Sequence, residues 1–250
     1  MAEALARTVL VTRPEPGLSD TRAALETLGW EPHLAPMLKI SSMPMHPARH
    51  VGRVIVTSSQ SLEGLRDAIP LSTPLTAVGE RTAARARAAG FTCVDHAAGN
   101  AASLVRHLGQ PEHGASLLLA TGEGLGVELA ADLRNHGWRV TRRVVYRTAA
   151  TPTLDASTRD LLSGDRVAAV LFYSAVTARS FLDALGPERA MLTRIRALAL
   201  SSRIGDALRD APFADIGVAA RPSQNALLSL LGPSPLMPAP PASPRRKATP

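Results

Sequence analysis

Five short segments combine small polar residues with glycine or charge, and each follows an apolar run of the chain. The segments are Thr12-Arg13, Thr57-Ser58-Ser59, Gly79-Glu80-Arg81-Thr82, Thr121-Gly122-Glu123, and Ser174 with Ser201-Ser202. In parallel α/β sheets, ligands bind beyond the carboxyl ends of the strands, where helix N-termini offer free N–H groups to anions. Helix capping by Ser and Thr is the alternative explanation for any one segment. If the segments converge on one cleft, together they predict a binding site for an anionic ligand.

Tyr146 is a candidate for proton chemistry. It is one of two tyrosines and ends an extended stretch that begins at Trp138. A phenol with a pKa of about 10 is protonated at neutral pH, so it can donate a hydrogen bond to a ligand or act as a weak general acid. The alternative is a half-buried strand tyrosine with no chemical role.

Several other chemistries are not supported by the motifs. The segment Gly122–Gly126 has the spacing G-x-G-x-G, and no acid follows about 20 residues later, so it does not predict dinucleotide binding. His46 and His50 flank a proline and have no acidic or cysteine neighbour, so we expect no metal site there. Cys93 is the one cysteine, which excludes an intramolecular disulfide, and we expect it in a buried strand. The sequence has no Walker A motif and no G-x-S-x-G elbow.

Composition limits the class of protein. The 250 residues carry a net charge of +7, are 45% hydrophobic and contain only 3% aromatic residues. A basic surface favours anionic partners. No nucleic-acid-binding motif accompanies the charge and stacking aromatics are scarce, so we expect no nucleic acid partner. No apolar run is long enough for a membrane span and no signal peptide is evident, so we expect a cytoplasmic protein with no membrane contact.

The chain repeats one plan. Trp138 follows Trp30 by 108 residues, each after a glycine, and Ser174 follows Ser58 by 116, each after a buried apolar run. Ser201 follows Gly79 by 122 residues, each at the start of a helix-like segment. Two copies of one α/β plan predict two lobes with a cleft between them.

Short apolar runs alternate with helical patterns of about ten residues, which is typical of βαβ units with parallel sheets. We expect strands at 9–11, 33–40, 54–56, 75–78, 91–94, 117–119, 138–146, 167–172, 195–200 and 216–219. The repeat alone leaves open which half of the first copy packs with which half of the second. The Pro-rich residues 233–250, which include a basic run, are predicted to be a disordered tail.

At these residues the chain resembles the uroporphyrinogen-III synthase family, over residues 8 to 231. The likeness rests on an ordered set of weak motifs: Val11-Thr12-Arg13-Pro14, Leu28-Gly29, Pro36-Met37-Leu38, Thr57-Ser58, Val78-Gly79-Glu80-Arg81-Thr82-Ala83, Gly137 with Val140 and Val145-Tyr146-Arg147-Thr148, and Pro222-Ser223. Two segments depart from the pattern. The loop 121–126 lacks an Arg that members often carry, and Leu200–Gly205 lacks the Thr-Ala of the first copy.

The resemblance implies an α/β fold of two flavodoxin-like parallel-sheet lobes, joined by a two-stranded linker, with a cleft between them. Lobe 1 would comprise residues 1–37 and 150–232, and lobe 2 residues 38–149, so each lobe takes half of each copy. Because the motif segments of the first copy match the family better, we expect lobe 2 to hold most of the substrate.

The resemblance also implies an activity. The substrate would be hydroxymethylbilane, a linear tetrapyrrole with eight carboxylates, possibly handed over by its synthase. The reaction loses water, inverts ring D and closes the macrocycle to uroporphyrinogen III, without a cofactor or metal, in a protein expected to be monomeric. Tyr146 would assist departure of the hydroxyl group. The expected substrate-binding residues are Thr12, Arg13, Thr57, Ser58, Ser59, Gly79, Glu80, Thr82, Thr121, Gly122, Ser174, Ser201 and Ser202. The alternatives are a non-catalytic two-lobed sensor of an anionic ligand and a degenerate paralogue of the synthase.

Overall fold

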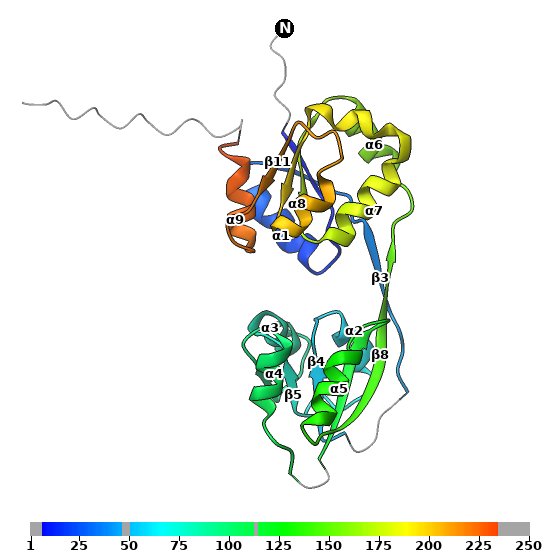
Figure 1. Ribbon diagram of the computed structural model, residues 1–250, viewed down its shortest axis with the longest axis vertical. Helices are drawn as coiled ribbons and strands as arrows, with labels where there is room; N and C mark the ends of the chain where they lie inside the picture. The colour runs from blue at the N-terminus through cyan, green and yellow to red at the C-terminus, as the bar shows by residue number, and fades with distance from the viewer. Residues whose placement is uncertain (1–6, 47–50, 113–114, 235–250) are drawn as a thin grey trace, which may run out of the picture. The chain divides into compact units, whose positions relative to one another are not determined.

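The computed structural model describes residues 7–46, 51–112 and 115–234. The chain divides into two compact units, which we call unit 1 (residues 1–39 and 150–250) and unit 2 (residues 40–149). The first boundary lies two residues after the one suggested by the sequence. Each unit contains one sheet covered by helices on both faces (Figure 1).

Unit 1 contains a five-stranded parallel sheet in the order β11-β10-β9-β1-β2. Its strands are β1 (Thr8–Val11), β2 (Glu31–Leu34), β9 (Val167–Phe172), β10 (Arg196–Ala199) and β11 (Asp215–Val218). One face packs against α6 (Ala156–Ser163), α7 (Ala175–Leu185) and α8 (Ser202–Leu208). The other packs against α1 (Gly17–Thr27) and α9 (Gln224–Leu228). The 3-10 helices η1 (Gly186–Arg194) and η2 (Ser229–Leu231) complete the unit.

Unit 2 contains a six-stranded sheet in the order β3-β8-β7-β4-β5-β6. Its strands are β3 (Leu38–Ser42), β4 (Arg53–Val56), β5 (Leu75–Ala77), β6 (Val94–His96), β7 (Ser116–Gly122) and β8 (Arg139–Ala150). Helices α2 (Ser61–Arg66) and α3 (Glu80–Ala88) cover one face. Helices α4 (Ala101–Leu108) and α5 (Val127–Asn135) cover the other.

Buried apolar runs specify the central strands. Val9, Leu10 and Val11 are fully buried, as are Val54, Ile55 and Val56. A strand of a parallel sheet is covered on both faces, so it is a continuous apolar run rather than an alternating pattern. Such strands are built from Val, Ile, Leu and Ala, so a sequence with few aromatic residues can still form a core in each unit.

The sheet topology shows how the repeated plan is folded. The strands β1 and β2 join β9, β10 and β11 of the second copy, whereas β7 and β8 join β4, β5 and β6 of the first. Counted from β1 in unit 1 and from β7 in unit 2, both sheets have the flavodoxin-like order, in which the first strand lies between the second and third, and unit 2 adds β3 at its edge. This exchange of halves is the arrangement that the family resemblance implied.

The chain passes between the units twice, in β3 and β8, which are neighbours in the sheet order. The Met43 N–H donates to the Val145 carbonyl at 2.8 Å, and the Thr151 N–H donates to the Met37 carbonyl at 2.9 Å. Residue numbers rise along β3 while those of the facing residues on β8 fall, so the two strands are antiparallel. The two-stranded linker expected from the resemblance is present.

Local differences from the sequence-based expectations have physical causes. The stretch 33–40, expected to be one strand, is divided between β2 and β3. Between the two strands, the backbone N–H groups of Ala35 and Met37 donate to the carbonyls of Val11 and Thr12. The strand expected at 91–94 is β6, which begins at Val94, so the expectation of a buried Cys93 is wrong and its side chain is exposed. Helix α6 was not expected; Asp155 caps it by accepting from the Thr158 N–H.

Some predicted features fall on residues that the structure does not describe. His50 lies outside the described residues, as do residues 235–250 of the predicted tail. His46 is exposed. In the described part of the chain, no helix is long and apolar enough to cross a membrane.

Candidate functional site

The predicted site residues gather at the carboxyl ends of the strands, separately in each unit. In unit 2, Thr57–Ser59 follow β4, Gly79–Thr82 follow β5, and Thr121-Gly122 end β7. Tyr146 of β8 is paired with Gly122 in the strand register, so it reaches the same edge of the sheet. In unit 1 the corresponding residues are Thr12, Arg13, Ser174, Ser201 and Ser202, which follow β1, β9 and β10.

Tyr146 is buried at the edge of unit 2, with 5% of its surface exposed. Burial raises the pKa of its phenol above the ordinary value of 10.0, although hydrogen bonding with the Ser58 side chain and the Gly122 backbone acts in the opposite direction. The phenol is therefore neutral throughout the physiological pH range. It can act as a hydrogen-bond donor there but cannot act as an anion.

Gly122 makes the space that Tyr146 occupies. A Cβ atom at Gly122 would lie 2.6 Å from two ring carbons of Tyr146 and 2.8 Å from its hydroxyl oxygen. Such a contact is far inside van der Waals range, so any larger residue would displace the ring. The contribution of Gly122 is thus the absence of a side chain, which permits close approach by an aromatic ring.

The glycines that follow serve the turn after β7. Gly124 and Gly126 have positive φ values of 73° and 76°. The buried Thr121 hydroxyl lies 3.1 Å from both the Gly122 and the Leu125 carbonyl oxygens, to which it can donate. A left-handed turn closed by a threonine therefore explains the G-x-G-x-G spacing without a dinucleotide.

Hydroxyl and backbone donors lie at the same edge of the unit 2 sheet as Tyr146. Thr57, Ser58 and Ser59 are partly exposed, and Ser58 accepts from the Gln60 N–H at 3.3 Å. Gly79 occupies the N-cap position of α3, so the first turn of that helix begins at this edge. Thr82 is partly exposed in that turn and donates its N–H to the Gly79 carbonyl.

Glu80, the first residue of α3, has two side-chain partners. It contacts the imidazole of His96 and lies 3.5 Å from the Arg87 guanidinium. A second carboxylate, Glu123, accepts from two nitrogens of Arg147 at 2.9 and 3.1 Å. Both carboxylates are thereby paired with cations at an edge predicted to meet an anionic ligand.

In unit 1, two of the predicted residues have structural roles. The Thr12 hydroxyl is fully buried and donates to the Leu171 carbonyl at 2.6 Å, which ties the end of β1 to β9. Ser174 caps α7 by accepting from the Thr177 N–H at 3.1 Å. Ser201 occupies the N-cap position of α8 without a side-chain cap, and Ser202 is exposed.

Arg13 lies in a cluster that the sequence did not reveal. Its guanidinium carbon lies 4.0 Å from the centroid of the Tyr173 ring, and its Nη1 donates to Gln224 Oε1 at 3.3 Å. The same nitrogen lies 3.4 Å from the Thr21 hydroxyl oxygen. Tyr173 has a detectable sequence signal, since it directly follows a buried strand. Gln224 has none, because it is 211 residues away from Arg13.

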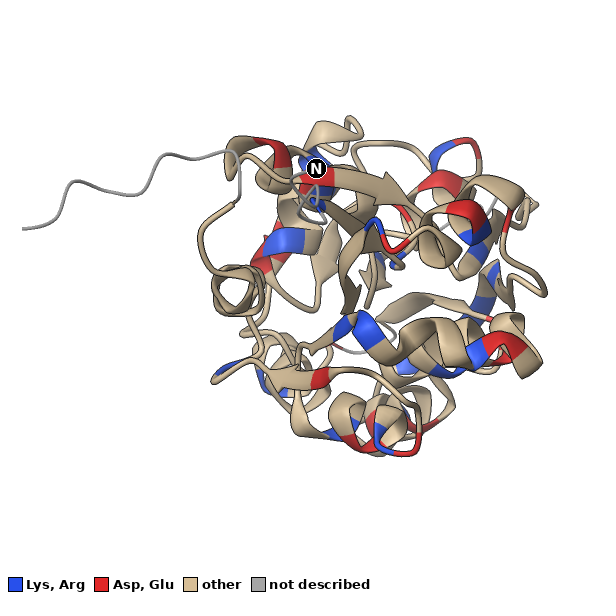
Figure 2. Ribbon diagram, turned by 90° about the horizontal axis from the view of Figure 1, so that it is seen from above, with Lys and Arg blue, Asp and Glu red and all other residues tan. Residues whose placement is uncertain are grey.

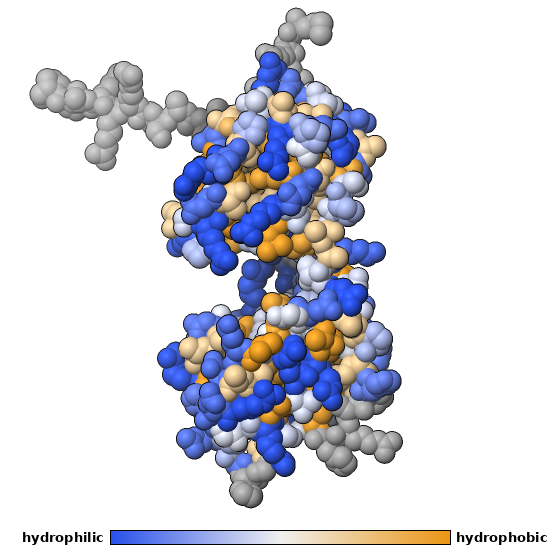
Figure 3. All heavy atoms as spheres, turned by 45° about the vertical axis from the view of Figure 1, so that its right-hand side comes forward, coloured by the Kyte–Doolittle hydropathy of each residue, from blue (hydrophilic) through white to orange (hydrophobic). Residues whose placement is uncertain are grey.

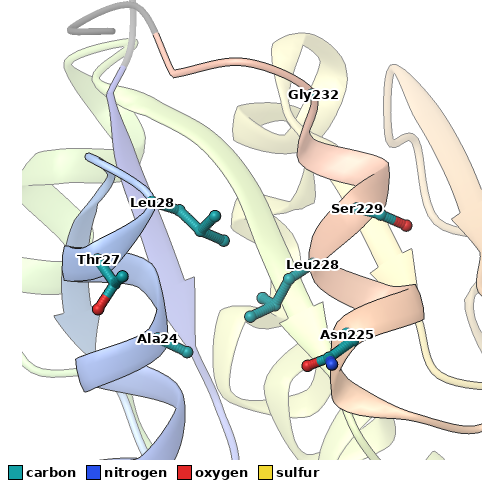
Figure 4. A pocket seen from close by; sticks show the side chains of 7 residues that line it. All are labelled: Ala24, Thr27, Leu28, Asn225, Leu228, Ser229 and Gly232. Atoms are coloured by element: carbon teal, nitrogen blue, oxygen red, sulfur yellow. The ribbon is translucent and has the colours of Figure 1, made fainter.

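The described surface also contains an apolar pocket of about 420 Å³ on unit 1. It lies between α1 and α9, where the side chains of Leu28 and Leu228 approach each other from the two helices (Figure 4). Its lining is Ala24, Thr27, Leu28, Asn225, Leu228, Ser229 and Gly232. None of the predicted site residues lines it, and it includes the last turn of α1 rather than the first. We therefore do not assign it to the candidate site.

Charge and hydropathy are mixed over the surface rather than segregated. Basic and acidic residues are scattered along the ribbon in both units (Figure 2). Hydrophilic and apolar residues are interspersed on the face in Figure 3. Among the described residues, no group of three or more His, Cys, Asp or Glu side chains could hold a metal ion. The site is thus distinguished by local geometry at the strand ends.

Comparisons with known proteins agree with this fold. The family model described as Uroporphyrinogen-III synthase HemD matches residues 19–229. The crystal structure of uroporphyrinogen-III synthetase from Helicobacter pylori 26695 is 18% identical, with a TM-score of 0.62, over 90% of this chain and 97% of that chain. A mutant uroporphyrinogen III synthase from the extremely thermophilic bacterium Thermus thermophilus is 20% identical over 90% of this chain and 97% of that chain, with a TM-score of 0.49. No curated protein sequence matches the chain.

Proposed function

Because the chain belongs to the uroporphyrinogen-III synthase family, we propose that it cyclises hydroxymethylbilane to uroporphyrinogen III, with inversion of ring D and loss of water. The observation that carries this proposal is the family match over residues 19–229, which spans both units. The physical features agree with an anionic substrate, since the protein is basic and its strand ends carry hydroxyl and N–H donors.

The chemistry requires little acid catalysis, since an electron-rich pyrrole expels hydroxide readily. The enzyme must hold the linear tetrapyrrole so that the inverted ring D attacks through a spiro intermediate before the chain closes without inversion. Catalysis of this kind comes from positioning, in which a bound geometry replaces a search through many conformations.

Tyr146 is the proposed group that assists departure of the hydroxyl. Burial keeps its phenol protonated, so it can donate a hydrogen bond to the leaving oxygen as negative charge develops there. The close approach of the ring to Gly122 restricts where the oxygen can lie. Its raised pKa makes complete proton transfer less favourable, and hydrogen-bond donation is therefore its main contribution.

The proposed substrate-binding residues lie at the edge of unit 2 and in unit 1, and six of them, Thr57, Ser58, Gly79, Thr82, Gly122 and Ser174, are the proposed carboxylate holders. The full set is Thr57, Ser58, Ser59, Gly79, Glu80, Thr82, Thr121 and Gly122 in unit 2, and Thr12, Arg13, Ser174, Ser201 and Ser202 in unit 1. Within this set the buried Thr12 and Thr121 hydroxyls bind backbone carbonyls, so they act by fixing the loops. Glu80 would act through its backbone N–H, because its side chain is anionic and paired with Arg87 and His96. The substrate contacts of the set come from partly exposed hydroxyls, helix N-termini and Arg13.

We further propose that the protein works as a monomer in the cytoplasm, without a cofactor, on substrate released by hydroxymethylbilane synthase. Unit 2 would hold most of the substrate, since its edge carries Tyr146 and the three adjacent hydroxyls of Thr57, Ser58 and Ser59.

One assay tests the activity. Purified protein is incubated with hydroxymethylbilane, and the type I and type III isomers of the product are separated after oxidation. We expect the type III isomer to predominate. Formation of the type I isomer alone, at the rate seen without protein, would reject the proposed enzyme and favour a ligand sensor or an inactive paralogue.

A further inference from the structure

Residues from three elements of unit 1 orient the side chain of Arg13. Tyr173, directly after β9, supplies an aromatic face 4.0 Å from the guanidinium carbon. Gln224, the first residue of α9, supplies a carbonyl oxygen 3.3 Å from Nη1. Thr21 of α1 lies 3.2 Å from both the Tyr173 hydroxyl and Gln224 Oε1, which links the three partners to one another.

The backbone of α1 leaves space for the same guanidinium. A Cβ atom at Gly17 would lie 2.1 Å from Arg13 Nη2. Gly17 is the first residue of α1 and is buried, so the space of its missing side chain is filled by Arg13 rather than by solvent. The arginine is thus confined on one side by α1 and on another by a stacked ring.

The contacts with Gln224 and Thr21 orient the guanidinium of Arg13. Both side chains act as neutral acceptors for its Nη1, so these two contacts fix the guanidinium plane. Stacking on an aromatic ring likewise restricts an arginine, while the donors at the rim of the guanidinium stay in its plane. A guanidinium held in this way can donate a charge-assisted hydrogen bond to a carboxylate.

We propose that Gln224 and Tyr173 are positioning residues that hold Arg13 ready to bind a carboxylate of the substrate. The inference rests on the proposed function, because the substrate class is the polycarboxylate tetrapyrrole named above. It assigns unit 1 a specific part in substrate binding, through a side-chain cation rather than the hydroxyl and N–H donors of unit 2.

The decisive variant is Gln224→Glu, which keeps the size of the side chain and places a carboxylate against Arg13. This carboxylate competes with the substrate for the guanidinium. We expect KM for hydroxymethylbilane to rise about tenfold or more, the usual effect of losing a hydrogen bond to a charged group, with kcat changed much less. The midpoint temperature of thermal unfolding should be unchanged or slightly higher, because a new ion pair forms with Arg13.

The matched control is Asn225→Asp, which makes the same change of charge at the next residue. Asn225 lines the apolar pocket rather than the Arg13 cluster. We expect its KM to equal that of the natural protein. Tyr173→Phe, which keeps the ring against Arg13, should raise KM less than Tyr173→Leu, which removes it. If Gln224→Glu misfolds, Gln224→Met removes the acceptor alone; KM should then rise through loss of positioning, and an unchanged KM would overturn the inference.

The outcomes separate this inference from the proposed function. An unchanged KM in a folded Gln224→Glu variant would overturn the inference while leaving the synthase activity in place. If the natural protein forms no type III isomer, the readout becomes binding of uroporphyrin III, the oxidised octacarboxylate, by fluorescence. Weaker binding by Gln224→Glu than by Asn225→Asp would then support the inference although the enzyme proposal had failed. Equal binding would overturn the inference.

Discussion

The two units have the same strand order, but their carboxyl edges are built differently. In unit 1, Tyr173 follows β9 and lies under the guanidinium of Arg13, within a set of side-chain contacts that includes Gln224. In unit 2, Thr57 occupies the place after β4 that corresponds to Tyr173, and Tyr146 comes instead from β8. Unit 1 thus positions a cation, whereas unit 2 positions a neutral phenol.

This difference shows how one duplicated plan can supply two kinds of contact. The buried strands are constrained by burial on both faces, so both copies keep apolar runs. The residues that follow the strands lie in loops and contribute less to the core, so they can diverge without loss of the fold. Each edge uses a glycine to admit a large side chain, Gly17 for Arg13 and Gly122 for Tyr146.

The largest expected effect is that of Gly122→Ala on the edge of unit 2. The added methyl group would lie 2.6 Å from the Tyr146 ring, so the ring must move. Displacing the ring moves the phenol out of place, so we expect type III formation to fall at least as far as it does when the phenol is lost, several-fold or more. The measurement is the initial rate of type III formation with the type I background subtracted.

A double-mutant cycle shows whether this loss passes through Tyr146. In a Tyr146→Ala background the ring is gone, so Gly122→Ala should have little further effect on the rate. Independent, multiplicative losses from the two substitutions would contradict the role assigned to Gly122.

Tyr146→Phe should have the next largest effect. The ring and its packing remain, but the donor is lost, and we expect the rate of type III formation to fall several-fold. The same change in unit 1, Tyr173→Phe, keeps the ring beneath Arg13 and should leave kcat close to that of the natural protein. Equal kcat losses in the two variants would remove the functional difference between the edges.

The contrast also shows what the sequence could predict. Apolar runs such as Val54–Val56 placed the central strands, and the ordered motifs of the family implied the exchange of halves between units. The Arg13 cluster could not be predicted, since its contacts join Thr21, Tyr173 and Gln224 across the fold. The Gly122–Tyr146 contact was equally inaccessible, because it depends on the register of β7 and β8. Cys93 was misplaced because a three-residue edge strand carries a weak periodic signal.

A smaller effect, on stability rather than rate, is expected from Thr12→Val in unit 1. The Thr12 hydroxyl is buried and donates to the Leu171 carbonyl, and valine would leave that acceptor without its partner. The free energy of unfolding should fall by about 1–3 kcal/mol, measured by urea denaturation. Thr27→Val is the control, because the Thr27 hydroxyl donates to the Ala23 carbonyl in an exposed position. A similar loss in both variants would show that burial of the Thr12 bond is unimportant.

The smallest effect concerns acid stability at the other end of the unit 2 sheet. Burial acts to raise the pKa of Asp95, but hydrogen bonds from Thr76, Arg53 and His107 hold it below the ordinary value of 3.8. Arg53 begins β4, and its Nη1 donates to Asp95 Oδ2 at 2.9 Å. A carboxyl with a lowered pKa in the folded state stabilises the fold above the unfolded pKa, and this contribution is lost as pH falls through the folded value.

Asp95→Asn should therefore lower the urea midpoint modestly at pH 7 and have a smaller effect near pH 3. The proportion of type III isomer at pH 7 should not change, because Arg53 lies at the amino end of its strand and the Tyr146 edge lies at the carboxyl end. Asp132→Asn on the exposed surface of α5 is the control for removing one negative charge. A changed isomer ratio in folded Asp95→Asn would mean that the two ends of the sheet are coupled, and the site would then extend beyond the strand ends.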